Sequence, residues 1–109
     1  MRLVIIESPY AGDTERNVAY ARAAVRDSLL RGEAPIASHL LYTQPGILDD
    51  ADPGERQHGI DAGLAWRRVA EATVAYVDLG CSSGMRYGIG RAIEAGVPVE
   101  TRTIPGWAA

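Results

Sequence analysis

The sequence contains no lysine and no phenylalanine, and it has one cysteine, Cys81, among 109 residues. Without lysine the chain has neither a Schiff-base nucleophile nor the phosphate-binding lysine of Walker-type loops, which excludes P-loop kinases and ATPases. A lone cysteine forms no intramolecular disulfide, and with only His39 and His58 it cannot complete a thiolate zinc site. We therefore expect no metal, and nothing in the composition points to a cofactor.

Long hydrophobic runs and an excess of positive charge are also missing. The apolar run nearest the start covers only residues 3–6, far fewer than the about 20 residues that a membrane span needs. The net charge is −3 and the pI is near 5.3, so nucleic-acid polymers are repelled on average. We expect a cytoplasmic protein with neither a membrane nor a nucleic-acid polymer as its partner.

The patterning that is present predicts one domain, spanning residues 1–109, with an α/β fold. Apolar, β-branched segments predict strands over 2–7, 34–38, 73–78 and 97–104. Helical spacing and capping signals predict helices over about 14–31, 52–71 and 83–95, with a long loop over 39–51. This alternation predicts a small doubly wound parallel sheet of four to five strands, flavodoxin-like or Rossmann-like, with helices on both faces.

Three segments should meet at the carboxyl ends of the strands, where open parallel sheets bind ligands: 8–13, 39–50 and 78–84. Ser82, Ser83 and Gly84 open the last predicted helix, whose free N–H groups favour an anion such as a phosphate or carboxylate. The alternative is that Ser82 or Ser83 only caps that helix.

Other side chains in these segments are candidates for chemistry. Asp78 ends an apolar strand at the expected crevice, where a buried carboxylate needs partners. His39 could hydrogen-bond a base or sugar, or be a structural histidine, and Tyr10 could stack on a base or belong to the core. Gly88 and Gly90, inside a predicted helix, indicate close packing there, because each costs about 1 kcal/mol relative to alanine.

Three motifs resemble the nucleoside 2-deoxyribosyltransferase-like superfamily, which also contains nucleotide N-glycoside hydrolases. They are Ile-Ile-Glu-Ser-Pro-Tyr-Ala-Gly-Asp at 5–13, Ala-Ser-His-Leu-Leu at 37–41, and the segment 82–92. The chain is most similar to short phage and bacterial members. The resemblance implies that the loop with Ser8, Tyr10 and Gly12 lies near a sugar and that 82–84 anchors a phosphate. It also implies a small-molecule nucleotide or nucleoside as ligand, and a homodimer.

The chain departs from the enzymes of this superfamily at their acidic residues. Their pattern S-x-G-x-x-x-E places a glutamate where this sequence has Gly88, and their aspartate at the start of the third strand falls on Thr73. One interpretation is a binding protein with a degenerate N-glycosidase-type site. The alternative is an active N-glycosidic hydrolase or deoxyribosyltransferase with a relocated carboxylate, for which Asp78 is the first candidate and Asp13 or Glu7 the others.

Overall fold

A computed structural model describes residues 1–107 of the chain as a parallel four-stranded sheet covered by helices. The strands are β1 (Leu3–Glu7), β2 (Ala34–Ile36), β3 (Ala72–Tyr76) and β4 (Val99–Arg102), and their order in the sheet is β2-β1-β3-β4. In the register, Ile5 of β1 pairs with Ile36 of β2 and with Thr73 of β3. The predicted doubly wound parallel fold is confirmed.

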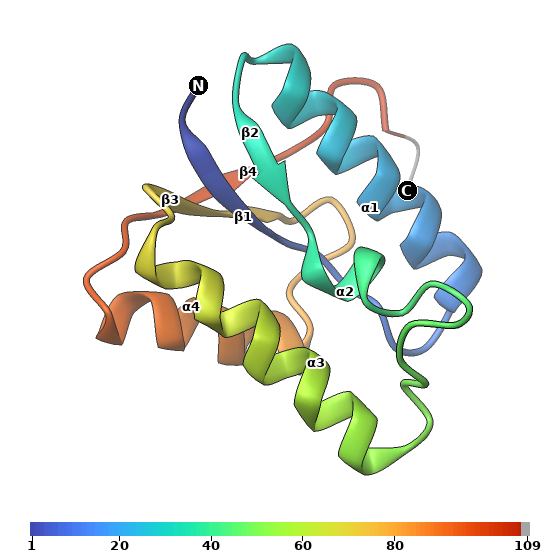
Figure 1. The fold of residues 1–109 in the computed structure, drawn as a ribbon. Helices are drawn as coiled ribbons and strands as arrows, with labels where there is room; N and C mark the ends of the chain where they lie inside the picture. The colour runs from blue at the N-terminus through green and yellow to red at the C-terminus, as the bar shows by residue number, and fades with distance from the viewer. Residues whose placement is uncertain (108–109) are drawn as a thin grey trace.

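The helices lie on both faces of the sheet, with α1 on one face and α3 and α4 on the other (Figure 1). Their bounds are α1 Thr14–Leu30, α2 Ser38–Leu41, α3 Pro53–Ala65 and α4 Ser83–Glu94, with a 3₁₀ turn, η1, at Trp66–Arg68. The crossovers after β1 and β3 lead to adjacent parallel strands, whereas the connection from β2 to β3 passes β1. The strand order therefore reverses between β1 and β3.

Several predicted element boundaries were wrong. The strands predicted over 34–38, 73–78 and 97–104 are shorter in the structure and end at Ile36, Tyr76 and Arg102. The segment 39–51, expected to be a loop, begins inside the short helix α2. The helix expected over 52–71 does start at its Asp52 cap, which accepts a hydrogen bond from the Glu55 backbone N–H, but it ends at Ala65. It tightens there into η1, and the chain then meets the sheet where the Glu71 N–H donates to the Leu3 carbonyl.

Alternation along β1 and β3 sends side chains to two different environments. Val4 and Ile6 belong to a buried core that they share with Tyr20 and Ala24 of α1. That core also includes Val74 and Tyr76 of β3, both fully buried. The intervening residues, among them Glu7, face α3 and α4 instead. The period of two thus places a carboxyl group at the end of an otherwise apolar strand, on the face covered by α3 and α4.

The contact between α2 and α3 depends on Gly63, which supports a stability prediction. A Cβ atom at Gly63 would lie 2.8 Å from Cβ of Ser38, so Gly63→Ala should lower the free energy of unfolding by about 1–3 kcal/mol through overpacking. At Gly90 a Cβ would meet nothing within 4 Å. We expect Gly90→Ala to stabilise α4 by about 0.5–1 kcal/mol. Urea unfolding of both variants tests these two predictions. A Gly63→Ala variant that is as stable as Gly90→Ala would contradict the predicted overpacking at Gly63.

Candidate functional site

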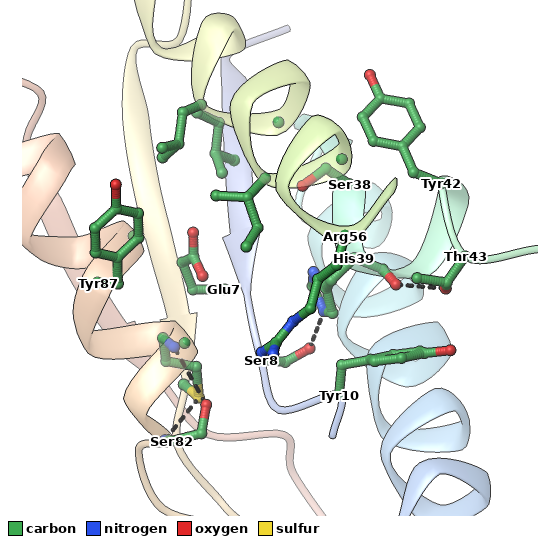
Figure 2. A pocket seen from close by; sticks show the side chains of 18 of the residues that line it. Glu7, Ser8, Tyr10, Ser38, His39, Tyr42, Thr43, Arg56, Ser82 and Tyr87 are labelled. Atoms are coloured by element: carbon green, nitrogen blue, oxygen red, sulfur yellow. Dashed lines mark hydrogen bonds between the residues drawn. The ribbon is translucent and has the colours of Figure 1, made fainter. Parts of the chain in front are cut away.

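A cavity of about 290 Å³ opens at the carboxyl end of β1, between α3 and α4 (Figure 2). It lies at the reversal of strand order, where doubly wound sheets bind their ligands. All three segments that the sequence predicted to converge contribute to its wall. Its polar lining includes Glu7, Ser8, Tyr10, Ser38, His39, Asp50, Glu55, Arg56, Ser82, Ser83 and Tyr87.

Glu7 is the last residue of β1, and its side chain lies against α4 at Gly88. Within residues 1–107 its carboxyl group takes part in no hydrogen bond or ion pair. Burial without a partner raises the pKa of Glu7 to about 8, because desolvation penalises the charged form. In the free protein near neutral pH this group is therefore mostly a neutral carboxylic acid.

Ser8 and His39 form a hydrogen-bonded pair across the ends of β1 and α2. The Ser8 Oγ lies 2.6 Å from Nε2 of His39, and Ser8 is only 5% exposed. Burial lowers the pKa of His39 to about 4, so the imidazole is neutral at pH 7. The pair therefore offers hydrogen-bonding groups to the cavity without adding a positive charge.

The loop that follows Ser8 is held in place by Asn17 of α1. The Asn17 side-chain amide donates to the carbonyl of Tyr10 at 2.9 Å and to that of Ala11 at 3.1 Å, and Asn17 is fully buried. These two bonds fix the backbone beside the cavity, so that Tyr10 is presented at its edge (Figure 2). The aromatic ring thus lies where a planar base could stack.

Positive charge reaches the cavity from α3. Arg56 points into it in Figure 2, and its nearest ion-pair partner, Asp50, is 3.8 Å away. At the start of α4 the Ser82 Oγ accepts a hydrogen bond from the Met85 N–H at 3.2 Å, so Ser82 does cap the helix. The sequence did not single out Arg56, because the cap signals at the start of α3 account for its neighbours Asp52 and Glu55 without a ligand.

Residues 2–102 match a family described as "Domain of unknown function (DUF7768)". The chain belongs to this DUF7768 family. No curated protein sequence matches it.

Two solved structures resemble the DUF7768 chain. One is a 2-deoxyribosyltransferase from the psychrotolerant bacterium Bacillus psychrosaccharolyticus, with a TM-score of 0.64 and 17% identity over 98% of this chain and 76% of that one. The other is a 2-deoxyribosyltransferase from Leishmania mexicana, with a TM-score of 0.60 and 16% identity over 94% of this chain and 65% of that one. These similarities show a nucleoside 2-deoxyribosyltransferase-like fold, which the sequence resemblance had predicted.

Not every predicted site residue of the DUF7768 chain lines the cavity. Asp78 lies on the α1 side, where its Oδ2 accepts hydrogen bonds from the Tyr20 hydroxyl at 2.7 Å and the Ile104 N–H at 2.9 Å. Asp13 is exposed and caps α1. Gly12, with a φ of +101° that favours glycine, lines a separate shallow hollow next to the cavity. Catalytic or binding roles for these three residues stay predictions.

Within residues 1–107, no three His, Cys, Asp or Glu side chains come together in a way that could hold a metal ion. In the same range no helix is long and apolar enough to cross a membrane.

Proposed function

We propose that the DUF7768 domain binds a nucleoside or nucleotide in the cavity between α3 and α4. The observation that carries this proposal is the convergence of Ser8, His39 and the start of α4 on one cavity at the reversal of strand order. A volume of about 290 Å³ is at the small end of the range for small-molecule sites, which suits a ligand the size of a nucleoside. The 2-deoxyribosyltransferase-like fold supports the same ligand class.

Each part of such a ligand has a complementary group in this cavity. The neutral Ser8–His39 pair matches sugar hydroxyl groups, and Tyr10 matches the face of a base. The Arg56 guanidinium and the exposed Ser83 at the start of α4 match a 5′-phosphate or a similar anion. On this proposal the site is degenerate, because Gly88 stands where the resembling enzymes carry a glutamate.

A second candidate function is that of an N-glycosidic hydrolase or deoxyribosyltransferase acting on nucleosides or nucleoside 5′-monophosphates. One specific observation favours it: an unpartnered carboxyl group, that of Glu7, lies in the cavity. We also propose that the protein is cytoplasmic. We further propose that it forms a homodimer, and size-exclusion chromatography with light scattering tests this oligomeric state directly.

Ligand binding is tested by thermal shift with a panel of nucleosides and nucleoside 5′-monophosphates. A ligand at 100 times its Kd should add about 2.7 kcal/mol to the free energy of unfolding and raise the Tm accordingly. We expect Arg56→Ala to reduce the shift given by monophosphates and to leave that of the parent nucleosides nearly unchanged, because only the phosphate needs the cation.

The matched control for that experiment is Arg68→Ala, which removes an exposed arginine that does not line the cavity. Every ligand should raise the Tm of this control variant by as much as it raises the Tm of the wild type. If no nucleoside or nucleotide raises the Tm of the wild-type protein, the proposed function is wrong. If both arginine variants weaken monophosphate binding equally, the loss of affinity comes from the change in net charge and not from a contact between Arg56 and the phosphate in the cavity.

A further inference from the structure

Two unfavourable features of the structure meet at one point in the cavity. Gly88 occupies the interior of α4, where glycine is less favourable than alanine. Facing it, the half-buried Glu7 carboxyl group has no hydrogen-bond partner in the described chain, and removing an unpaired carboxyl group even partly from water is also costly. Neither feature helps the fold, so their coincidence calls for a common explanation.

The geometry links the two residues directly. A Cβ atom placed on Gly88 would lie 2.6 Å from Cδ of Glu7 and 2.9 Å from its Oε1, and it would be closer still to Oε2. Any side chain at position 88 would therefore displace the carboxyl group. The glycine keeps open the space that the Glu7 carboxyl occupies, so the pair works as one unit.

Glu7 differs from the other two acidic residues of the cavity, which have partners of their own. Asp50 pairs with Arg56 at 3.8 Å, and Glu55 accepts a hydrogen bond from the Asp49 N–H at 3.2 Å. Glu7 alone among the three is free to act on a ligand. A desolvated carboxylate is also a stronger nucleophile than a hydrated one, because it carries no shell of water that must first be removed.

We propose that Glu7 is the catalytic nucleophile of an N-glycosidase site, held in position by the space at Gly88 and acting on the anomeric carbon of a nucleoside or nucleoside 5′-monophosphate. This inference rests on the proposed function, because it requires that ligand in the cavity. It assigns the relocated carboxylate to β1, in preference to Asp78.

The proposed reaction has two steps. A Glu7 carboxylate oxygen forms a bond to C1′ while the bond from C1′ to the base nitrogen breaks, and the electron pair of that bond leaves with the base, which takes a proton from water. In the second step the oxygen of a water molecule bonds to C1′, the ester bond to Glu7 breaks with its electron pair returning to the carboxylate, and water's proton goes to solvent. The net products are free base and free sugar, as in retaining glycoside hydrolysis.

The primary test compares wild-type protein with Glu7→Gln, which preserves size and removes the nucleophile. Base release from a panel of nucleosides and 5′-monophosphates is followed by chromatography, and ligand binding by thermal shift. We expect Glu7→Gln to lose at least about 1,000-fold in kcat while the ligand-induced shift persists. The control Glu94→Gln changes an exposed carboxylate on α4 and should turn over as the wild type does.

The pH profile distinguishes a nucleophile from a proton donor at the same place. The pKa of Glu7 is raised to about 8 by burial, so kcat/KM of a nucleophile should rise with pH and level off above about 8. A profile that falls through this range overturns the nucleophile role. Folding shows the same titration: relative to Glu7→Gln, the wild type should lose stability as the pH rises from about 4.5 to about 8.

A transposition experiment tests the pairing of Glu7 with Gly88. The double variant Glu7→Ala, Gly88→Glu removes the carboxyl from β1 and returns it to the same space from α4. We expect base release to recover by at least tenfold over Glu7→Ala alone. No recovery, in a double variant that melts and binds ligand as Glu7→Ala does, overturns the proposed equivalence of the two positions.

The remaining outcomes separate this inference from the proposed function. Wild-type protein that binds nucleosides or nucleotides but releases no base above a buffer blank overturns the catalytic role and leaves the binding proposal intact. A Glu7→Gln variant that loses ligand binding together with turnover assigns Glu7 to binding and also overturns the role. Absence of both binding and base release overturns both proposals.

Discussion

Replacing Glu33 by glutamine is expected to lower the free energy of unfolding by about 3 kcal/mol at pH 7. Glu33 is 6% exposed and receives two hydrogen bonds of 2.7 Å from the Arg102 guanidinium, one of 2.7 Å from Arg2, and one of 2.8 Å from the Ser28 hydroxyl. Glutamine keeps the volume but removes the negative charge, so the positive charge of the nearly buried Arg102 guanidinium is less well compensated. Chemical denaturation of the two proteins measures the difference.

The pH dependence of that difference is a second readout. The two bonds from Arg102 and the bond from Arg2 lower the pKa of Glu33 to about 2, from an ordinary value near 4.5. A lowered carboxyl pKa stabilises the fold above pH 4.5, and this stabilisation is lost as the pH falls toward 2. The difference in the free energy of unfolding between wild type and Glu33→Gln should therefore be largest at pH 7 and should decrease as the pH falls from 4.5 toward 2.

Glu94→Gln provides the matched control for Glu33→Gln. Glu94 pairs with Arg91 at 3.4 Å, but its side chain is 68% exposed, so the change should cost less than about 0.5 kcal/mol. Equal losses in the two variants would show that burial of the Glu33 cluster contributes nothing beyond a surface ion pair.

Local patterns in the sequence were enough to predict the fold. The apolar run 2–7 and the run 73–78 correspond to β1 and β3, and the Asp52 cap marks the start of α3 as predicted. These signals are local, because strand patterning and capping depend on residues within a few positions of one another. The end of α3 at Ala65 was not predictable in the same way, since it depends on where the chain must turn to meet β1.

The position of the cavity was predictable, but the roles of its carboxyl groups were not. Topology alone brings Ser8, His39 and residues 82–84 to one edge of the sheet. Asp78 ends the predicted strand 73–78 and Glu7 ends the predicted strand 2–7, so the sequence could not say which carboxyl group faces the cavity. In the structure β3 ends at Tyr76, two residues before Asp78. The alternation of β1 carried the signal, because Glu7 shares the face of Ile5 and not that of the core residue Ile6.

The second prediction with a large effect concerns Asp78. Asp78→Ala should lower the free energy of unfolding by about 2–4 kcal/mol, because it removes the acceptor of two hydrogen bonds and leaves their donors without a partner. The Tyr20 hydroxyl, on a side chain with 0% exposure, and the Ile104 N–H would both lose their partner. Asp78 thereby joins α1 to the segment after β4. Thermal and urea unfolding measure the loss.

Tyr20→Phe isolates one part of this contact, since it removes the hydroxyl that donates to the Asp78 carboxylate and accepts from the Asp78 N–H at 2.8 Å. A double-mutant cycle with Asp78→Ala should show coupling of at least about 0.5 kcal/mol, because the two side chains share these bonds. Asp78→Asn keeps one acceptor oxygen and should cost less than Asp78→Ala.

Measurements of ligand binding and base release in the same variants distinguish a structural role of Asp78 from a catalytic one. If Asp78 only holds α1 and the chain end together, ligand binding and base release per folded molecule should match the wild type in Asp78→Asn, measured below its reduced Tm. The hydrogen-bonding pattern favours this result, because both bonds to Oδ2 come from the side of the sheet that packs on α1. If Asp78→Asn instead loses turnover while it still binds the ligand, Asp78 has the catalytic role predicted from the sequence, and the Glu7 carboxyl group does not have the role proposed for it.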